Sequence, residues 1–278
     1  MSKRKVIFCT YSSIYSSIFL KNLLESNKVE VVAIINSTRI LRADNGFIKG
    51  SIKQILMTGW RYSTYLFLIT DFFSWLQIIF GLNKNSLKTV HGMAHFYQIP
   101  ILDTRDINQE ESVDFICQSQ ANYLVAAHFN QLVKANILDL PHLKCLNVHP
   151  SLLPHFKGVD PVFYALLKNE RRVGVSLHRM SESFDTGEVL LQEKQLVPVS
   201  ACVFSINIQL FSAGAKLVCQ WLDSDHRKKV LKLDESNSNQ YDSWPTASVV
   251  RQYNNAGKCL IGLREYYSSI TLLKKYKL

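Results

Sequence analysis

Short apolar runs rich in β-branched residues alternate with segments of helical periodicity along the N-terminal half of the chain. Residues 5–11 (KVIFCTY) and 29–36 (VEVVAIIN) are such runs, and IFLKNLLES between them has apolar residues at helical spacing. Residues 99–104 and 121–127 repeat the pattern around a helical segment with acidic residues in its first turn. This alternation predicts an α/β fold with a doubly wound, Rossmann-like, mostly parallel sheet.

The turn after the first predicted strand reads TYSSIYSS and contains no glycine. The Gly-x-Gly-x-x-Gly turn that lets a pyrophosphate approach the backbone is therefore missing there, and a dinucleotide site is disfavoured. The hydroxyls and amides of Ser12, Ser13 and Ser16 could still bind a phosphate group at a helix N-terminus.

A long apolar segment interrupts the strand pattern. Residues 62–82 form a stretch of 21 residues in which Asp71 is the only formal charge. Length alone would permit a membrane span, but a central Asp costs about 2.5–3.5 kcal/mol on insertion scales. We therefore expect a helical insertion at about 45–90. Its apolar surface between residues 52 and 82 could pack on the sheet, form a homodimer contact or touch a membrane surface.

The balance of charge and the cysteines limit the class of protein. The chain carries 32 Lys and Arg against 22 Asp and Glu, a formal charge of +10. A basic surface admits anionic partners without selecting among small molecules, nucleic acid and membrane. The six cysteines are scattered, with no Cys-x-x-Cys pair, which favours free thiols in a reducing compartment. The N-terminal apolar run is too short for a signal peptide, so we expect a cytoplasmic protein.

The stretch 145–158, CLNVHPSLLPHFKG, places polar side chains at the end of a predicted strand. Residues i and i+2 of a strand point to the same face, so Asn147 and His149 should project together. Pro150 then ends the strand, which suits the carboxyl edge of an open α/β sheet, where ligands bind. Asp185 follows in a polar loop after another predicted strand and can reach the same edge.

An amide, an imidazole and a carboxylate together suit acyl transfer. The amide donates to a developing oxyanion, the imidazole moves a proton, and the carboxylate orients the imidazole. Spacing alone leaves open that single Asn, His and Asp residues serve as caps, turns and surface groups.

The segment NVHPSLLPHFKG, with FDTG placing Asp185 36 residues after His149, resembles the folate-dependent formyltransferase family. Its members include glycinamide ribonucleotide transformylase, methionyl-tRNA formyltransferase and the sugar N-formyltransferases. The resemblance implies a formyltransferase catalytic domain over residues 1–200, interrupted by the helical insertion, with 201–278 as a C-terminal helix and small extension. It also implies that the formyl group of 10-formyltetrahydrofolate, the co-substrate, passes to a primary amine without a metal.

The resemblance also implies roles for individual residues. Asn147 and His149 would stabilise the oxyanion, with His149 also moving a proton, and Asp185 would hold the imidazole in its working state. The family's pterin pocket uses the segment just upstream of the Asn-x-His strand and the loop ahead of the aspartate. In this chain those positions are Phe129, Asn130, Gln131, Val133, Ser183 and Phe184.

The acceptor is expected to be a small, anionic amine. Residues 158–167 (GVDPVFYALL) resemble the stretch that faces the amino sugar in sugar N-formyltransferases, so an amino sugar is the favoured acceptor. Contacts to it are expected from Ser151, Asp160 and His178. His178 matches a histidine of the sugar and ribonucleotide branches, with a structural strand histidine as the competing interpretation. Ser151 could simply cap its turn.

Three alternative functions stay open. One is methionyl-tRNA formylation, but the chain after Pro198 is short for the barrel domain of those enzymes, and a nucleic acid partner is disfavoured. Another is formyltetrahydrofolate hydrolysis, although such hydrolases usually have His where Pro150 stands. A non-catalytic folate-binding protein is the third, and the three intact catalytic residues argue against it. His91 and His95 have the i, i+4 spacing of a metal pair, but no third ligand is evident.

Overall fold

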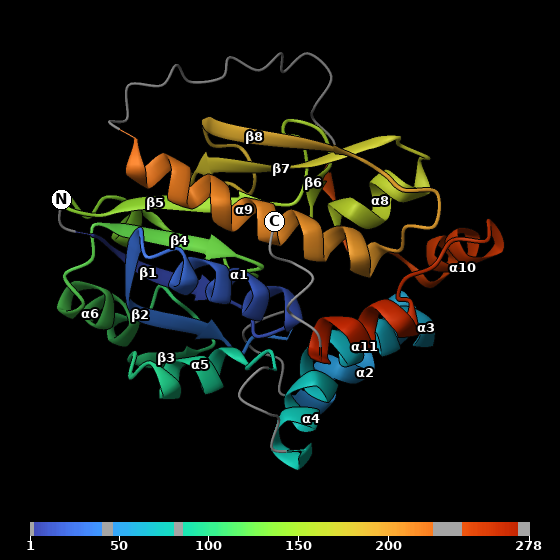
Figure 1. The fold of residues 1–278 in the computed structure, drawn as a ribbon, viewed down its shortest axis with the longest axis horizontal. Coiled ribbons are helices and arrows are strands. Elements are labelled where there is room, and N and C mark those ends of the chain that lie inside the picture. Colours follow the sequence, from blue (N-terminus) through green and yellow to red (C-terminus); the bar gives the residue numbers. More distant parts are fainter. Residues whose placement is uncertain (1–2, 41–46, 81–85, 225–240, 272–278) are drawn as a thin grey trace.

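The central sheet has the strand order β3-β2-β1-β4-β5-β7-β8 in the computed structural model, which describes residues 3–40, 47–80, 86–224 and 241–271 (Figure 1). Five neighbouring strands run parallel: β1 (Arg4–Thr10), β2 (Val29–Ser37), β3 (Ile101–Thr104), β4 (Tyr123–Ala127) and β5 (Lys144–His149). Two more, β7 (Arg172–Arg179) and β8 (Val189–Leu196), extend the sheet in antiparallel fashion. The predicted mostly parallel α/β sheet is confirmed.

Helices cover both faces of this sheet. On one face lie α1 (Ile14–Glu25), α5 (Val90–Phe96), α8 (Pro161–Leu167) and α9 (Val203–Asp223), and on the other α6 (Glu110–Gln118) and α7 (Ala135–Leu138). Successive residues of β1 divide between the two faces, because side chains of a strand alternate. Val6 and Phe8 join the apolar core under α1 and α9, whereas Ile7 and Cys9 join the smaller core under α6 and α7. The sheet is therefore doubly wound.

The expected insertion is helical and consists of α2 (Phe47–Thr58), α3 (Trp60–Phe67), a π-helical turn (Leu68–Phe72) and α4 (Phe73–Phe80). Buried tyrosines anchor it to the sheet layers. The hydroxyl of Tyr65 lies 2.7 Å from that of Tyr15 on α1, and the hydroxyl of Tyr62 donates to Asp160 Oδ2 at 2.7 Å. Among the described residues, no helix combines the length and apolar composition that crossing a bilayer requires.

The C-terminal helices pack against this insertion. They are α10 (Ala247–Asn255) and α11 (Leu263–Thr271), and Figure 1 shows α11 lying along the inserted helices, outside the sheet layers. The hydroxyl of Tyr266 on α11 donates to the carbonyl oxygen of Leu68 at 2.7 Å, and α10 contacts α2 and α3. Two segments nearly 200 residues apart thus form one helical lobe, which the sequence did not predict.

The long helix α9 packs against the sheet and against α1. The apolar side of α9 covers α1, β7 and β8, so a division at residue 200 would separate this helix from the face that it buries. The division into a 1–200 domain and a 201–278 extension stays a prediction. A two-stranded parallel ladder joins β6 (Lys157–Gly158) to β9 (Tyr241–Asp242) and ties the extension to the loop after β5.

Candidate active site

Strands β5 and β7 bring the predicted polar residues to one face of the sheet. Leu146 and Val148 of β5 point into the core under α9, so Asn147 and His149 project together on the opposite face, as predicted. On β7, His178 is the direct partner of Asn147. Three side chains capable of donating or accepting protons therefore converge where β5 ends.

The carboxylate of Asp185 reaches this cluster from the loop after β7. Its Oδ1 lies 3.3 Å from His149 Nδ1 and 4.0 Å from His178 Nε2, and the side chains of all three residues are almost fully buried. Oδ2 accepts the backbone N–H of Gly158 at 3.0 Å. Asp185 has a positive φ of 56°, a backbone conformation that only a tightly closed loop enforces on a residue with a side chain. The sequence-predicted trio of Asn147, His149 and Asp185 is thus brought together.

The imidazole of His149 lies between two acceptors. Its Nε2 is 3.0 Å from the carbonyl oxygen of Phe156, and its Nδ1 faces Asp185. Each ring nitrogen of His149 therefore faces an oxygen, one of a backbone carbonyl and one of a carboxylate.

The hydrogen-bond partners of His178 fix which of its ring nitrogens carries the proton. Its Nδ1 lies 2.7 Å from the carbonyl oxygen of Arg179, which can only accept, so Nδ1 carries the proton. Nε2 then accepts from Asn147 Nδ2 at 3.0 Å. Burial, and next the neighbouring charge of His149, lower the pKa of His178 to about 4, which keeps this ring neutral.

Gly187 explains why the Asp-x-Gly sequence ends in glycine. A Cβ atom at this position would stand 1.8 Å from the carbonyl oxygen of Arg179, the same oxygen that holds His178 Nδ1. The loop can close over the histidine only when residue 187 has no side chain. The motif is therefore a packing requirement of the site as well as a source of its carboxylate.

The loop after β4 carries four of the predicted folate contacts, and the structure distributes them between the surface and the interior. Gln131 is buried, and its side chain bonds the backbone N–H of Ile107 at 2.6 Å. Val133 is buried in the core under α6 and α7. Both side chains make contacts inside the protein. A pterin contact at these positions would therefore come from the backbone.

Two predicted residues of this loop and two of the opposite loop lie nearer the surface. Phe129 is half-buried, while Asn130 is exposed and donates from Nδ2 to the carbonyl oxygen of Arg39. Ser183 and Phe184 are exposed ahead of Asp185. The folate contacts of these four residues stay a prediction.

The predicted acceptor contacts have internal partners. Asp160 caps α8 by accepting the Phe163 N–H at Oδ1, and its Oδ2 accepts from the Tyr62 hydroxyl. Burial raises the pKa of Asp160 to about 6. Ser151 is buried and donates to the carbonyl oxygen of His155. Both side chains therefore stabilise the loop after β5, and the acceptor contacts predicted for them gain no support from their placement.

The other polar residues noted in the sequence are also used internally. Ser13 caps α1, and Ser12 donates to Asn36 Oδ1 at 2.8 Å. His91 Nε2 lies 3.0 Å from the carboxylate of Asp103. Within the described ranges, no three His, Cys, Asp or Glu side chains are placed to hold a metal ion.

Sequence reasoning missed the contribution of the C-terminal extension to the site. Tyr241 of β9 lies beside Phe184, with ring centroids 6.3 Å apart, and both rings are nearly half exposed. Burial, and next the charge of Asp185, raise the pKa of the Tyr241 hydroxyl to about 12. The only signal was the unexplained YDSWPT stretch, whose partner strand is 84 residues earlier in the chain.

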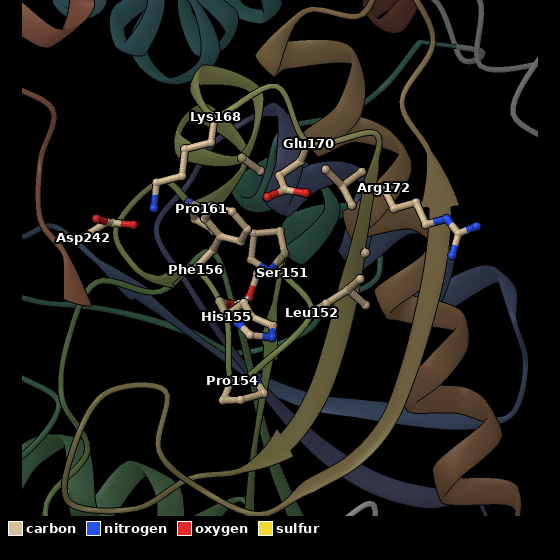
Figure 2. A pocket seen from close by; sticks show the side chains of 14 residues that line it. Ser151, Leu152, Pro154, His155, Phe156, Pro161, Lys168, Glu170, Arg172 and Asp242 are labelled. Carbon is tan, nitrogen blue, oxygen red and sulfur yellow. Dashed lines mark hydrogen bonds between the residues drawn. The ribbon is translucent and has the colours of Figure 1, made fainter. Parts of the chain in front are cut away.

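A cavity of about 460 Å³ lies beside the loop that follows β5 (Figure 2). Ser151, Leu152 and Phe156 of the loop face Lys168, and Arg172 stands at the edge of the cavity. Asn147, His149 and Asp185 do not line it. The loop therefore separates this cavity from the catalytic cluster.

An amide, an imidazole and a carboxylate at the carboxyl edge of an α/β sheet form a set of groups typical of acyl-transfer enzymes. A family model described as formyl transferase matches residues 67–217, more than half of the chain. The chain belongs to this formyl transferase family, as the sequence motif implied. The match covers β3 to β8 and most of α9.

Several curated relatives carry the name methionyl-tRNA formyltransferase. Methionyl-tRNA formyltransferase from Syntrophus aciditrophicus (strain SB) is 36% identical over 125 residues, 45% of this chain and 40% of that protein. The chain spans about half the length of the curated relatives that it matches.

Solved structures share the fold at lower identity. A sugar 3-N-formyltransferase, solved in the presence of dTDP and 5-N-formyl-THF, has a TM-score of 0.52 and 16% identity over 87% of this chain and 70% of that one. Phosphoribosylglycinamide formyltransferase from Bacillus halodurans has a TM-score of 0.52 and 18% identity, covering 79% of this chain and 93% of that one.

Proposed function

We propose that this chain transfers a formyl group from 10-formyltetrahydrofolate to a primary amine. The observation that carries the proposal is the buried cluster in which Asp185 contacts His149 at 3.3 Å while His178 fixes the amide of Asn147 at 3.0 Å. This arrangement supplies a donor for an oxyanion and a proton carrier within one site. Membership of the formyl transferase family supports the same reaction.

Asn147 serves as the oxyanion donor. One N–H of its amide is held by His178 Nε2, so the second N–H points away from that ring at the fixed angle of the amide group. A donor that is already oriented loses no free energy in reorganising as negative charge develops on the formyl oxygen. His178 acts through Asn147 and is a positioning residue.

His149 and Asp185 handle the proton. When protonated, the imidazole of His149 turns Nε2 from the carbonyl oxygen of Phe156 to the reacting group, stabilises the same oxyanion and gives a proton to the leaving nitrogen. Asp185 stabilises the charged ring and, held by Gly158, keeps Nδ1 in place. The proton lost by the attacking amine restores the starting state, so protons balance over one turnover.

The residues present fit a folate co-substrate, and 10-formyltetrahydrofolate would supply the formyl group. Phe129, from the loop after β4, and Met180, from the loop that leads to Asp185, both pack against the core under α6 and α7. The two loops thus meet the same face of the sheet on either side of the β5 terminus. Asn130 and Phe184 are exposed on these loops, and we assign to them contacts with the pterin and the benzoyl ring.

We assign the acceptor to the amino sugars, carried on a nucleotide or another anionic group. His178, which the resemblance associates with the sugar and ribonucleotide branches, is integrated into the catalytic cluster. The fold shared with a sugar 3-N-formyltransferase over 87% of this chain agrees with this acceptor class. Methionyl-tRNA is the second candidate acceptor, because the relative with 36% identity is named methionyl-tRNA formyltransferase.

The test follows tetrahydrofolate release from 10-formyltetrahydrofolate with nucleotide-linked amino sugars, with methionyl-tRNA and without any amine. We expect turnover with at least one amino sugar and none without amine. Turnover with methionyl-tRNA alone would move the acceptor to tRNA, and release without amine would make the protein a hydrolase. Absence of turnover with every amine, while the folate still binds, would contradict the proposed reaction.

A further inference from the structure

Helix α2 turns its apolar side to solvent. Its exposed apolar side chains are Ile48, Ile52, Ile55 and Leu56, at positions i, i+4, i+7 and i+8, which share one side of a helix. They are between 47% and 79% exposed. We call these four residues the α2 stripe. Trp60, two residues after the end of α2, is 68% exposed.

The inward side of the same helix consists mainly of small and polar residues, with half-buried Met57 beside them. Gly50 and Thr58 are buried, and Ser51 and Gln54 are half-buried. An amphipathic helix of a globular protein normally buries its apolar side, so the orientation of α2 is the reverse of the usual one. An apolar stripe left in water by the fold marks a surface that another body covers.

The formal charges of residues 47–70 are all positive. Residues 47–70 contain no Asp or Glu, and they include Lys49, Lys53 and Arg61, which are exposed. Lys49 and Lys53, at i and i+4, border the stripe along one edge. The guanidinium of Arg61 lies 5.4 Å from the centre of the Trp60 ring. Apolar side chains bordered by cations, with an indole ring at one end, form the pattern of a helix that lies in a membrane interface.

We propose that α2 binds the surface of a membrane rich in anionic phospholipid, with the α2 stripe entering the acyl boundary. Lys49, Lys53 and Arg61 contact the phosphate groups of the lipids. A helix of 12 residues lies along such a surface and does not cross it. The chain thereby gains a peripheral membrane contact that does not depend on its catalytic reaction.

A second copy of the chain fits this surface less well. Most dimers are two-fold symmetric, so the same patch would face itself. Lys49 and Lys53 of each copy would then meet a surface without acidic residues between 47 and 70. The like charges would repel each other, whereas an anionic bilayer attracts them.

The test is co-sedimentation of the full chain with vesicles of phosphatidylcholine and with vesicles that also contain phosphatidylglycerol. We expect binding to the phosphatidylglycerol vesicles, weakened by salt. The variant Ile52→Glu/Leu56→Glu should lose it, and Lys49→Glu/Lys53→Glu should reduce the partition by roughly an order of magnitude or more. The matched control is Leu196→Glu/Val199→Glu, because these two residues are also exposed and lie outside the helical lobe. It should bind nearly as wild type.

Several results would overturn the proposal. They are absence of binding to both kinds of vesicle at low salt, equal binding to both, and undiminished binding by the Ile52→Glu/Leu56→Glu variant. The last such result would come from light scattering, which measures the oligomeric state of the same proteins. A wild-type dimer that becomes a monomer in the Ile52→Glu/Leu56→Glu variant would assign the α2 stripe to a second copy of the chain.

Discussion

Asn147 Nδ2 donates to His178 Nε2 at 3.0 Å, across directly paired positions of β5 and β7. The direction of this hydrogen bond follows from a second one on the same ring. His178 Nδ1–H donates to the carbonyl oxygen of Arg179, so Nε2 carries no proton and accepts. The amide of Asn147 therefore cannot turn its oxygen toward the ring. A strand pair, rather than a flexible loop, sets the orientation of the proposed oxyanion donor.

Replacing His178 should reduce the turnover number more than it changes substrate binding. In His178→Leu the Asn147 amide loses its acceptor, and we expect kcat to fall roughly tenfold or more while KM for the formyl donor changes little. His178→Gln offers an acceptor oxygen and should restore part of kcat. Steady-state kinetics of the two variants provide the measurement. Equal losses in both, or a change confined to KM, would remove the positioning role.

Asp160 provides a test of stability against pH. Its pKa of about 6 in the folded chain is above the ordinary value of about 3.9, so the folded state binds more protons between these values. The contribution of this group to the free energy of unfolding is therefore full below about pH 4 and is lost as pH rises through 6. Asp160→Asn keeps one acceptor oxygen for the Phe163 N–H and presents an amide N–H that the Tyr62 hydroxyl oxygen can accept, without the charge, and it should flatten this dependence.

The matched variant Asp160→Ala removes both acceptors. It should lower the free energy of unfolding by about 1–3 kcal/mol, because the helix cap is lost and the buried Tyr62 hydroxyl keeps no partner there. Denaturant titrations between pH 4 and 7 compare the two variants. If Asp160→Asn retained stability but raised KM for the acceptor amine, the sequence-based prediction of an acceptor contact would be restored.

Gly158 links the extension to the catalytic carboxylate. Its φ is +126°, and a Cβ there would lie 1.9 Å from the carbonyl oxygen of Asp242. Gly158→Ala should therefore push β6 from β9 and pull the N–H of residue 158 away from Asp185. We expect stability to fall by about 2 kcal/mol or more and turnover by about tenfold or more.

Gly257→Ala is the control for this change. Gly257 also has a positive φ, +72°, but a Cβ there would meet no atom within 4 Å. The Gly257→Ala substitution should lower the free energy of unfolding only by the strain of the backbone conformation, about 1 kcal/mol, and should leave turnover unchanged. Equal effects of the two alanines on kcat would show that β9 is not needed for catalysis.

The sheet and the shared face of Asn147 and His149 could be predicted from the sequence because both follow local rules. The run VEVVAIIN is β2 almost to the residue, and the i, i+2 spacing of Asn147 and His149 places them on one face of β5. The partners that set protonation could not be predicted in this way. The carbonyl oxygen of Phe156 and the N–H of Gly158 come from irregular backbone, which has no periodic signal.

Several residues that the sequence predicted as folate or acceptor contacts have buried side chains. Gln131 and Val133 sit in a loop that sequence alone makes polar and accessible, yet both are buried. Asp160 precedes a proline that starts α8, and an Asp at that point satisfies the helix N-terminus. The contact between Asp160 and Tyr62 joins positions 98 residues apart, so only the folded chain reveals it.

The most direct test of the proposed mechanism is the rate of tetrahydrofolate release by Asn147→Ala under saturating amine and formyl donor. Loss of an oriented oxyanion donor should lower kcat by about 10²–10³-fold. Binding of the folate, measured by titration, and the midpoint of unfolding should stay near the wild-type values, since Asn147 is only partly buried. A kcat within a few-fold of wild type would contradict the account, because the amide fixed by His178 would then take no part in the reaction.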